Sequence, residues 1–346
     1  MSRFSAQILE LAIAHFPKAL LRDGEAESLR AVAGAVAPMT ALYFECRLKG
    51  RDMPVDVSQH FSASAGGPAA LLALARRHAD SADSWQRLAA FAAEWRAGGP
   101  LVEFGLEHDR GVAVPALFGG VATGLAEDRA AVAAFLAALV PESGVAWARM
   151  SAAIDAAGRH GLVAGRLIGA MLSRDGQLRC VFRGLRPQPA MAFLREIGWP
   201  GDVDALGALL AQPPFASEAA RLVLGFAPDP VAGCGIEMIY RKGDTGEGLD
   251  GRDALLAWLV DQGLAEPERV AALAEWNGPI TPMSAGTDWP DALIAEDLRA
   301  GFDPLVYFTK SLSHVKLNIA DGRIVEAKAY LALMPTQRGS SGAAHV

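Results

Sequence analysis

Charged side chains recur at alternate positions of several short apolar runs in this 346-residue chain. Lys316 and Lys328 lie on either side of an Asp321-Gly322 dipeptide, and Glu45 lies in the run LYFECRL near the start of the chain. Lysine and arginine side chains bind phosphate groups, and a carboxylate can orient a nucleophile and accept its proton. These residue types indicate a site for an anionic substrate beside a general base, provided that the fold brings them together.

The composition is that of a large globular protein without a basic surface. The chain is 51% hydrophobic, which is enough for a sizeable core, and its formal net charge of −7 argues against non-specific nucleic-acid binding. No apolar run reaches the roughly 18 to 20 residues that a membrane span needs, and the N-terminal segment lacks a signal-peptide core. Three cysteines without CxxC spacing favour a reduced compartment. We expect a cytoplasmic protein with neither a nucleic-acid nor a membrane partner.

Segments with strand and helix patterns follow one another in a regular order. Ten strand-like runs come in five pairs, and two pairs are joined by the Asp-Gly turn typical of a hairpin. Short turns require antiparallel pairing. Helical periodicity separates the pairs. The expected strand pairs are 42–48 with 55–61, 101–108 with 112–118, 166–173 with 177–183, 221–226 with 235–241, and 314–319 with 323–331. The expected helices are 5–21, 68–78, 84–96, 128–139, 143–160, 189–197, 253–262, 267–276 and 291–300.

This order predicts the fold class. About five α-β-β-α repeats favour an α/β protein with one ten-stranded antiparallel β-barrel and the helices outside it, since closure removes the sheet edges. We expect one domain over 1–334 and a flexible C-terminal tail over 335–346, where Gly and Ser are frequent. An alternative is a two-domain α+β protein whose hairpins stay open and whose charged faces meet solvent.

The alternation gives most strands an apolar face and a charged face. Amphipathic helices need an apolar surface to pack on, so the charged faces of such a barrel point into its lumen. Charges there are costly unless they are paired, hydrated or bound to a ligand. The first two strand pairs carry mostly acids and the last three mostly bases, which predicts an acidic side and a basic side of the lumen. Diphosphate is an obvious anion for the basic side.

With Glu45 on the first strand and Lys328-Ala329-Tyr330 on the last, this order resembles the aromatic prenyltransferases of the ABBA, or PT-barrel, family over about residues 5–334. The resemblance implies a prenyltransferase that moves a dimethylallyl or longer allylic group from a prenyl diphosphate to a peptide or small-molecule acceptor. The acceptor would be aromatic or basic, such as a guanidine or an amine. Peptide modification in natural-product biosynthesis would be the setting. Glu45 would be the catalytic residue, which orients the nucleophile and accepts its proton.

The resemblance also implies two sets of substrate contacts. The diphosphate is expected at Arg166, Arg179, Arg183, Arg241, Lys316, Lys328 and Tyr330. The acceptor is expected beside Tyr43, Asp56, Glu103, Glu107 and Glu237. The chain has no Asp-rich DDxxD motif and no Cys/His cluster, so no metal or cofactor built into the protein is predicted. Mg²⁺ is expected only as a partner of the diphosphate.

The chain departs from this family in its aromatic residues. It has only four tyrosines, whereas the family shields the allylic cation with several. A non-catalytic barrel that binds a peptide or small ligand is therefore an alternative function. The structural alternative to a catalytic role for Glu45 is a strand carboxylate paired with Arg47. The structural alternative to diphosphate binding by Lys328 and Tyr330 is an exposed face of the hairpin.

Overall fold

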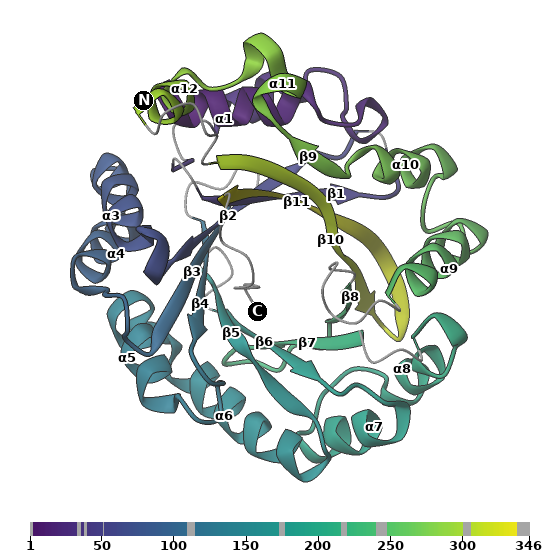
Figure 1. Cartoon of the computed structure of the whole chain (residues 1–346). Helices are drawn as coiled ribbons and strands as arrows, with labels where there is room; N and C mark the ends of the chain where they lie inside the picture. Colours follow the sequence, from purple (N-terminus) through teal and green to yellow (C-terminus); the bar gives the residue numbers. More distant parts are fainter. Residues whose placement is uncertain are drawn as a thin grey trace.

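The computed structural model describes residues 3–32, 36–37, 40–50, 52–108, 115–172, 177–215, 220–239, 248–299 and 306–337. Its centre is one sheet with strands in the order β1 (Ala41–Arg47), β2 (Asp56–Ser62), β3 (Leu101–His108), β4 (Ala116–Val121), β5 (Val163–Met171), β6 (Gln177–Arg183), β7 (Ala220–Phe226), β8 (Cys234–Ile239), β10 (Val306–Ala320) and β11 (Arg323–Gln337). β11 also pairs with β1, so these ten strands close into an antiparallel barrel (Figure 1). The predicted ten-stranded antiparallel barrel is confirmed, and the alternative with open hairpins is wrong.

Helices surround the barrel on its outer side (Figure 1). They are α1 (Arg3–Ala14) and α2 (Glu25–Ala31) before β1, α3 (Gly67–His78) and α4 (Asp83–Glu94) after β2, α5 (Arg129–Leu139) and α6 (Gly144–Arg159) after β4, α7 (Pro187–Glu196) and α8 (Val203–Leu210) after β6, and α9 (Gly248–Asp261), α10 (Pro267–Ala272), α11 (Pro282–Ala285) and α12 (Asp291–Arg299) after β8. A short strand, β9 (Gly278–Ile280), pairs with the beginning of β10. The helix-strand-strand order therefore recurs around the whole barrel.

Some elements differ from the sequence prediction. The periodicity does not predict α2, α8, α11 or β9, because each has eight residues or fewer. The helix expected over 5–21 ends at Ala14, because Pro17 cannot donate the hydrogen bond that would continue it. Of the strand expected over 112–118, residues 112–114 lie outside the described residues, and β4 runs from Ala116 to Val121.

The outward face of the barrel carries the apolar core. Phe44 of β1 meets Phe16 edge to face, with ring centroids 5.2 Å apart. On the other side of the barrel, Phe182 of β6 lies 5.0 Å from Phe193 of α7. Since neighbouring side chains of a strand point to opposite faces, residues such as Glu45 and Arg179 point inward. The predicted assignment of apolar faces to the helices therefore holds for these strands.

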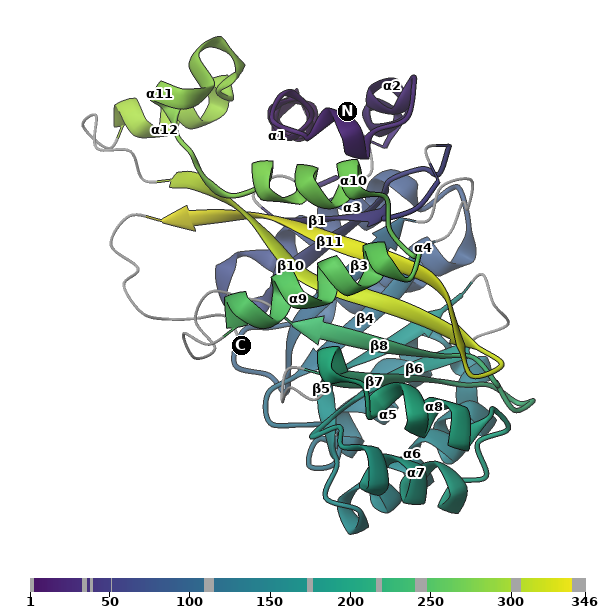
Figure 2. The same cartoon turned by 90° about the vertical axis from the view of Figure 1, so that its right-hand side faces the viewer.

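The last hairpin is longer than the pattern predicts. β10 and β11 have 15 residues each, and they slant across one side of the barrel in Figure 2. Asp321 and Gly322 both have positive φ, 49° and 70°, as a two-residue type I′ turn requires. β11 runs to Gln337, so residues 335–337 belong to a strand and not to the expected tail, and residues 338–346 lie outside the described residues.

An irregularity in β10 changes which of its lysines reach the lumen. The pairing of β10 with β11 shifts register between Leu312 and His314. After the shift, Lys316 lines the interior cavity. Before the shift, Lys310 lies outside the barrel, where its ammonium is 5.6 Å from the ring centre of Trp276. Lys310 and Lys316 are an even number of residues apart, so a regular strand would place them on the same face. Because of the register shift, they lie on opposite faces of β10.

No helix in the described part of the chain is long and apolar enough to span a bilayer. Cys46, Cys180 and Cys234 are all buried free thiols. Burial raises the pKa of each thiol, that of Cys234 to about 12, so these cysteines are unreactive core residues.

Candidate functional site

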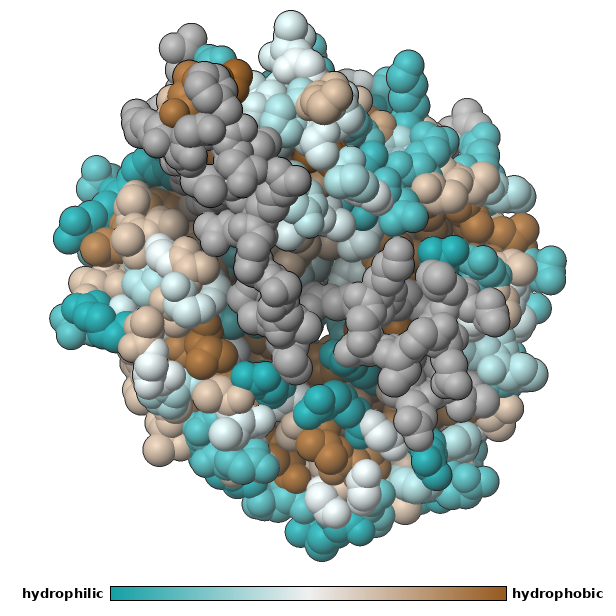
Figure 3. Space-filling view, viewed as in Figure 1, coloured by the Kyte–Doolittle hydropathy of each residue, from teal (hydrophilic) through white to brown (hydrophobic). Residues whose placement is uncertain are grey.

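A cavity of about 260 Å³ lies inside the barrel. It is lined by Glu45, Arg47, Pro54, Asp56, Glu107, Arg179, Lys316, Asn318, Lys328 and Tyr330. Viewed along the barrel, the molecular surface is hollowed at its centre (Figure 3). Charged residues from the first and the last strands therefore meet around one space.

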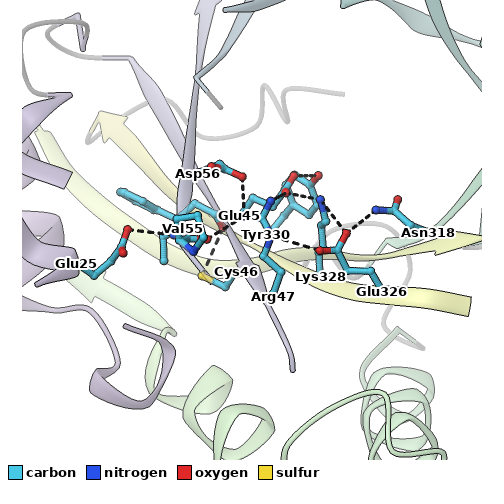
Figure 4. A network of polar contacts seen from close by, with 12 residues as sticks. Glu25, Glu45, Cys46, Arg47, Val55, Asp56, Asn318, Glu326, Lys328 and Tyr330 are labelled. Carbon is cyan, nitrogen blue, oxygen red and sulfur yellow. Dashed lines mark hydrogen bonds and ion pairs between the residues drawn. The ribbon is translucent and has the colours of Figure 1, made fainter. Parts of the chain in front are cut away.

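Glu45 lies at the centre of a polar network in this cavity (Figure 4). Lys328 donates a hydrogen bond of 2.7 Å to Oε1 of Glu45, and the Tyr330 hydroxyl donates to Oε2. Nη2 of Arg47 lies 3.4 Å from Oε1. Burial alone would raise the pKa of Glu45, but the lysine, the tyrosine and the arginine lower it to about 2. Glu45 is therefore an anion with both oxygens engaged.

The network continues beyond Glu45. Arg47 binds Asp56 at 2.6 Å through Nη1 and lies 3.4 Å from Glu326 through Nε. Glu326 also lies 3.1 Å from the ammonium of Lys328 and accepts a bond of 2.7 Å from Asn318. Burial lowers the pKa of Lys328, but Glu45 and Glu326 raise it above its ordinary value. Lys328 is therefore a cation held by two carboxylates.

These contacts correct the predicted separation of an acidic side from a basic side. Glu45 faces Tyr330 directly in the pairing of β1 with β11, and Arg47 faces Lys328. Barrel closure thus brings the acids of the first strands against the bases of the last hairpin. The ion pair of Glu45 with Arg47, which the structural alternative predicted, is also present as one contact of this network.

Three cations occupy directly opposed positions on neighbouring strands. Lys316 of β10 faces Lys328 of β11, which faces Arg47 of β1. Like charges so placed repel one another, since neighbouring strands lie only about 4.8 Å apart. Glu237 relieves part of this repulsion, because it lies 3.2 Å from the ammonium of Lys316. Burial raises the pKa of Glu237, but Lys316 lowers it below its ordinary value. The three cations therefore lie in one row across the lumen, each beside a carboxylate.

Arg179 reaches the cavity from the opposite wall. Its strand, β6, is five places from β1 in the ring of ten. Within the part of the chain that the structure describes, the Arg179 side chain makes no hydrogen bond or ion pair, although it lines the cavity. A guanidinium in this position is available to a ligand anion.

The wall from β4 to β8 also carries apolar side chains beside Arg179. Phe118 of β4 lies over Gly169 of β5, since a Cβ at Gly169 would come within 2.8 Å of the Phe118 ring. Further apolar residues of these strands share the inward face by register: Leu167, Val181, Val223 and Ile239. The sequence interpretation missed them because it followed charges. The available signal was the weak alternation of ALFGGV and VAGRLIGAM, which are largely apolar on both faces.

A second polar group lies further along the lumen. Nδ1 of His60 on β2 is 2.6 Å from Oε1 of Glu103 on β3. The His60 ring centre is 4.7 Å from that of Tyr43. His60 lies four residues beyond Asp56 on the same strand, so the two side chains share a face about 13 Å apart along the strand. The sequence interpretation assigned His60 no role, because a lone histidine on a strand is more often structural.

The structure brings only part of the predicted site together. The cavity lining includes Glu45, Asp56, Glu107, Arg179, Lys316, Lys328 and Tyr330. Glu237 is not in the lining but is paired with Lys316. Tyr43 and Glu103 surround His60 instead.

Two predicted arginines, Arg166 and Arg183, do not line the cavity. Arg166 donates from Nε to the carbonyl oxygen of Val121 at 3.0 Å. Arg183 has a buried Nε without a hydrogen-bond partner among the described residues. Arg241 lies outside the described residues. Across those residues, no group of three or more His, Cys, Asp or Glu side chains could hold a metal ion.

No protein-family model matches the sequence, and no curated protein matches it. Two crystal structures resemble the chain over most of its length. One is 6-dimethylallyltryptophan synthase from Micromonospora olivasterospora in complex with DMASPP and Trp, with 14% identity, a TM-score of 0.47 and 95% of each chain covered. The other is PriB in a binary complex with product diphosphate, with 13% identity, a TM-score of 0.41, and 95% of this chain and 94% of that chain covered.

Proposed function

We propose that this protein is a prenyltransferase that moves an allylic group from a prenyl diphosphate to a peptide or small-molecule acceptor inside the barrel. The observation that carries the proposal is that one lumen holds both cationic and apolar side chains. The cations are Arg179, Lys316 and Lys328, and the apolar residues are Phe118, Leu167 and Val181. An allylic diphosphate has an anionic head and a branched apolar tail, and the two kinds of side chain match them. A closed barrel also limits the access of water, which would otherwise capture an allylic cation.

The cations of the cavity suit the diphosphate head. Arg179 approaches from one wall, and Lys316 and Lys328 approach from the other. Arginine offers a planar fork and lysine a point charge to phosphate oxygens. Fixed cations stabilise the negative charge that grows on the diphosphate as it departs, which is the expected catalytic effect.

Mg²⁺ enters the proposal only as a partner of the diphosphate. Two carboxylates beside the cations, Glu45 and Asp56, are bound by Lys328 and Arg47 respectively. They therefore do not form an open ligand set on the protein, since Mg²⁺ demands a near-octahedral shell of oxygen ligands.

The apolar wall suits the tail and the reacting carbon. Phe118 of β4, Leu167 of β5 and Val181 of β6 offer ring and aliphatic surface on the same wall as Arg179. A ring face also attracts a cation, so Phe118 would stabilise positive charge on the allylic group. The acidic residues Glu103 and Glu107 favour an acceptor that carries N–H groups, such as a guanidine or an amine. Peptide modification in natural-product biosynthesis remains a prediction.

The test uses the full chain with dimethylallyl, geranyl and farnesyl diphosphates. Each is incubated with peptides that contain Arg, Lys, His, Trp or Tyr and with the free amino acids, and products are detected by mass spectrometry. Dimethylallyl thiodiphosphate, an unreactive analogue, is titrated by calorimetry. We expect Arg179→Gln and Lys316→Gln each to weaken its binding by about tenfold, the loss of one charge-assisted hydrogen bond.

Lys310→Gln is the matched control, because Lys310 lies on the same strand as Lys316 but outside the barrel. Its binding constant should equal that of the wild type. If the wild type binds no analogue and forms no prenylated product, the proposal is wrong. Binding of a peptide without turnover would then favour the non-catalytic barrel.

A further inference from the structure

The arrangement around Glu45 is unsuited to proton transfer. Lys328 and Tyr330 each occupy one of its oxygens. Its pKa is about 2, and a general base works best when its pKa is near the working pH. To accept a proton, Glu45 would have to give up contacts that also hold Lys328 in the lumen. A nucleophile that loses a proton in the barrel therefore needs another base.

His60 has the geometry that Glu45 lacks. Its Nδ1 lies 2.6 Å from a Glu103 oxygen, so in the neutral ring the proton is on Nδ1 and Nε2 is the acceptor. Nε2 has no hydrogen-bond partner among the residues that the structure describes. A Cβ at Gly105 would lie 3.4 Å from Nε2, so the missing side chain keeps this edge of the ring open. The His60 side chain is 21% exposed.

The strand register places His60 in one row with the proposed diphosphate and tail sites. Gly105 faces His60, Phe118 faces Gly105, Gly169 faces Phe118, and Arg179 faces Gly169. The two glycines alternate with the three side chains and leave space between them. Four strand spacings of about 4.8 Å separate His60 from Arg179 along the curved wall, about 19 Å in all. This distance leaves room for a diphosphate, its allylic carbon and an acceptor.

We propose that His60 accepts the proton of the acceptor and that Glu103 positions its imidazole, a role that rests on the proposed function. The C1–O bond of the prenyl diphosphate breaks, and its electron pair leaves with the diphosphate towards Arg179. The lone pair of the acceptor nitrogen forms the new bond to C1. The nitrogen proton passes to Nε2 of His60, and the carboxylate of Glu103 stabilises the resulting imidazolium. Glu45 is then a positioning residue for Lys328 and Tyr330.

The test measures the kinetics of full-chain variants. The acceptor is the one from the panel above that the wild type prenylates fastest. His60→Gln should lower kcat by about 10²- to 10⁴-fold, the usual contribution of a general base. Its binding constant for dimethylallyl thiodiphosphate should stay within twofold of the wild-type value. The wild-type kcat/KM should decline in acid as the base is protonated, and His60→Gln should abolish that decline.

Glu103→Gln is the conservative second variant. The groups that face His60 are Glu103 of β3 and Tyr43 of β1, with Asp56 and Glu107 further along the lumen. Glu103 positions the imidazole, so Glu103→Gln should lower kcat while the binding constant for dimethylallyl thiodiphosphate stays within twofold of the wild-type value. His160→Gln is the matched control, because His160 forms a similar 2.6 Å contact with Glu196 outside the barrel. Its kinetics should be unchanged.

Each remaining outcome overturns a specific statement. If His60→Gln keeps kcat within twofold, the role of His60 is wrong while the proposed function stands. If His60→Gln loses analogue binding as well, His60 has a structural role and the inference also fails. If the wild type itself gives neither product nor analogue binding, the proposed function fails, and the inference fails with it.

Discussion

The ammonium of Lys328 lies 2.7 Å from the carboxylate of Glu45, although the two residues are 283 positions apart in the chain. They belong to β11 and β1, the strands whose pairing closes the barrel. Both side chains are nearly buried, with 13% and 7% exposed. The same ion pair therefore stabilises the seam of the fold and fixes a cation in the candidate site.

Removal of one partner of this pair should destabilise the protein strongly. Lys328→Met and Glu45→Gln are each expected to lower the free energy of unfolding by about 3 kcal/mol, because each leaves a buried group with a missing partner. The double variant should lose about 1 to 3 kcal/mol less than the sum of the two single losses. Urea unfolding of all four proteins measures this coupling.

Asp204→Asn serves as the control for that cycle, because it breaks the exposed pair between Arg195 and Asp204. This substitution should lower the free energy of unfolding by less than about 1 kcal/mol. Additive losses in the Glu45 and Lys328 variants would show that the two side chains do not stabilise each other.

Glu45 should make stability depend on pH in the acid range. Its pKa falls from 4.5 to about 2 in the folded protein. Between these values the unfolded chain binds a proton that the folded chain does not, so the stability present above pH 4.5 is lost as the pH falls. Thermal unfolding from about pH 6 down to about pH 3 measures this loss. Glu45→Gln should be less stable at neutral pH, and its curve should be flatter in this window.

His108 should produce a separate loss of stability at higher pH. Its Nε2 accepts a 2.9 Å hydrogen bond from the side-chain amide of Gln59, and burial, with a smaller effect of His78, lowers its pKa from 6.5 to about 4. The unfolded state therefore binds more protons than the folded state between these values, and stability falls as the pH drops through the window. His108→Gln should remove this decline and leave the Glu45 window unchanged. If His108→Gln keeps the wild-type dependence of stability on pH, the decline does not come from His108.

The space beside Phe118 should set the length of the prenyl chain. A Cβ at Gly169 would lie 2.8 Å from the Phe118 ring and 3.2 Å from the end of Met171. Gly169→Ala should therefore push the ring into the lumen. We expect kcat/KM for geranyl diphosphate to fall about tenfold relative to dimethylallyl diphosphate, a typical effect of about one methylene in an apolar pocket.

Gly144→Ala is the control for this change, because Gly144 begins α6 outside the barrel and a Cβ there meets nothing within 4 Å. Its preference between the two diphosphates should match the wild type. Equal loss of both substrates in Gly169→Ala would instead indicate damage to the barrel.

The strand alternation predicted which face of each charged strand points inward. Glu45 and Arg179 lie opposite Phe44 and Cys180 in the two-residue period, and that period follows from backbone geometry alone. It did not cover the register shift in β10 that separates the faces of Lys310 and Lys316, because such a shift cannot be read from the spacing of apolar residues. It also gave no reason to separate Arg166, at a strand irregularity, from Arg179 in the cavity.

The sequence by itself determined the repeated element order, the apolar outer faces and the presence of inward charges. These follow from local periodicity and from the need of amphipathic helices to bury one side. Only the tertiary structure decided which charges meet. Closure sets β1 against β11, so Glu45 binds Lys328, while Arg179 lies across the lumen without a partner among the described residues. The physical reason is that side-chain pairing depends on strand order and register around the ring, which local pattern does not encode.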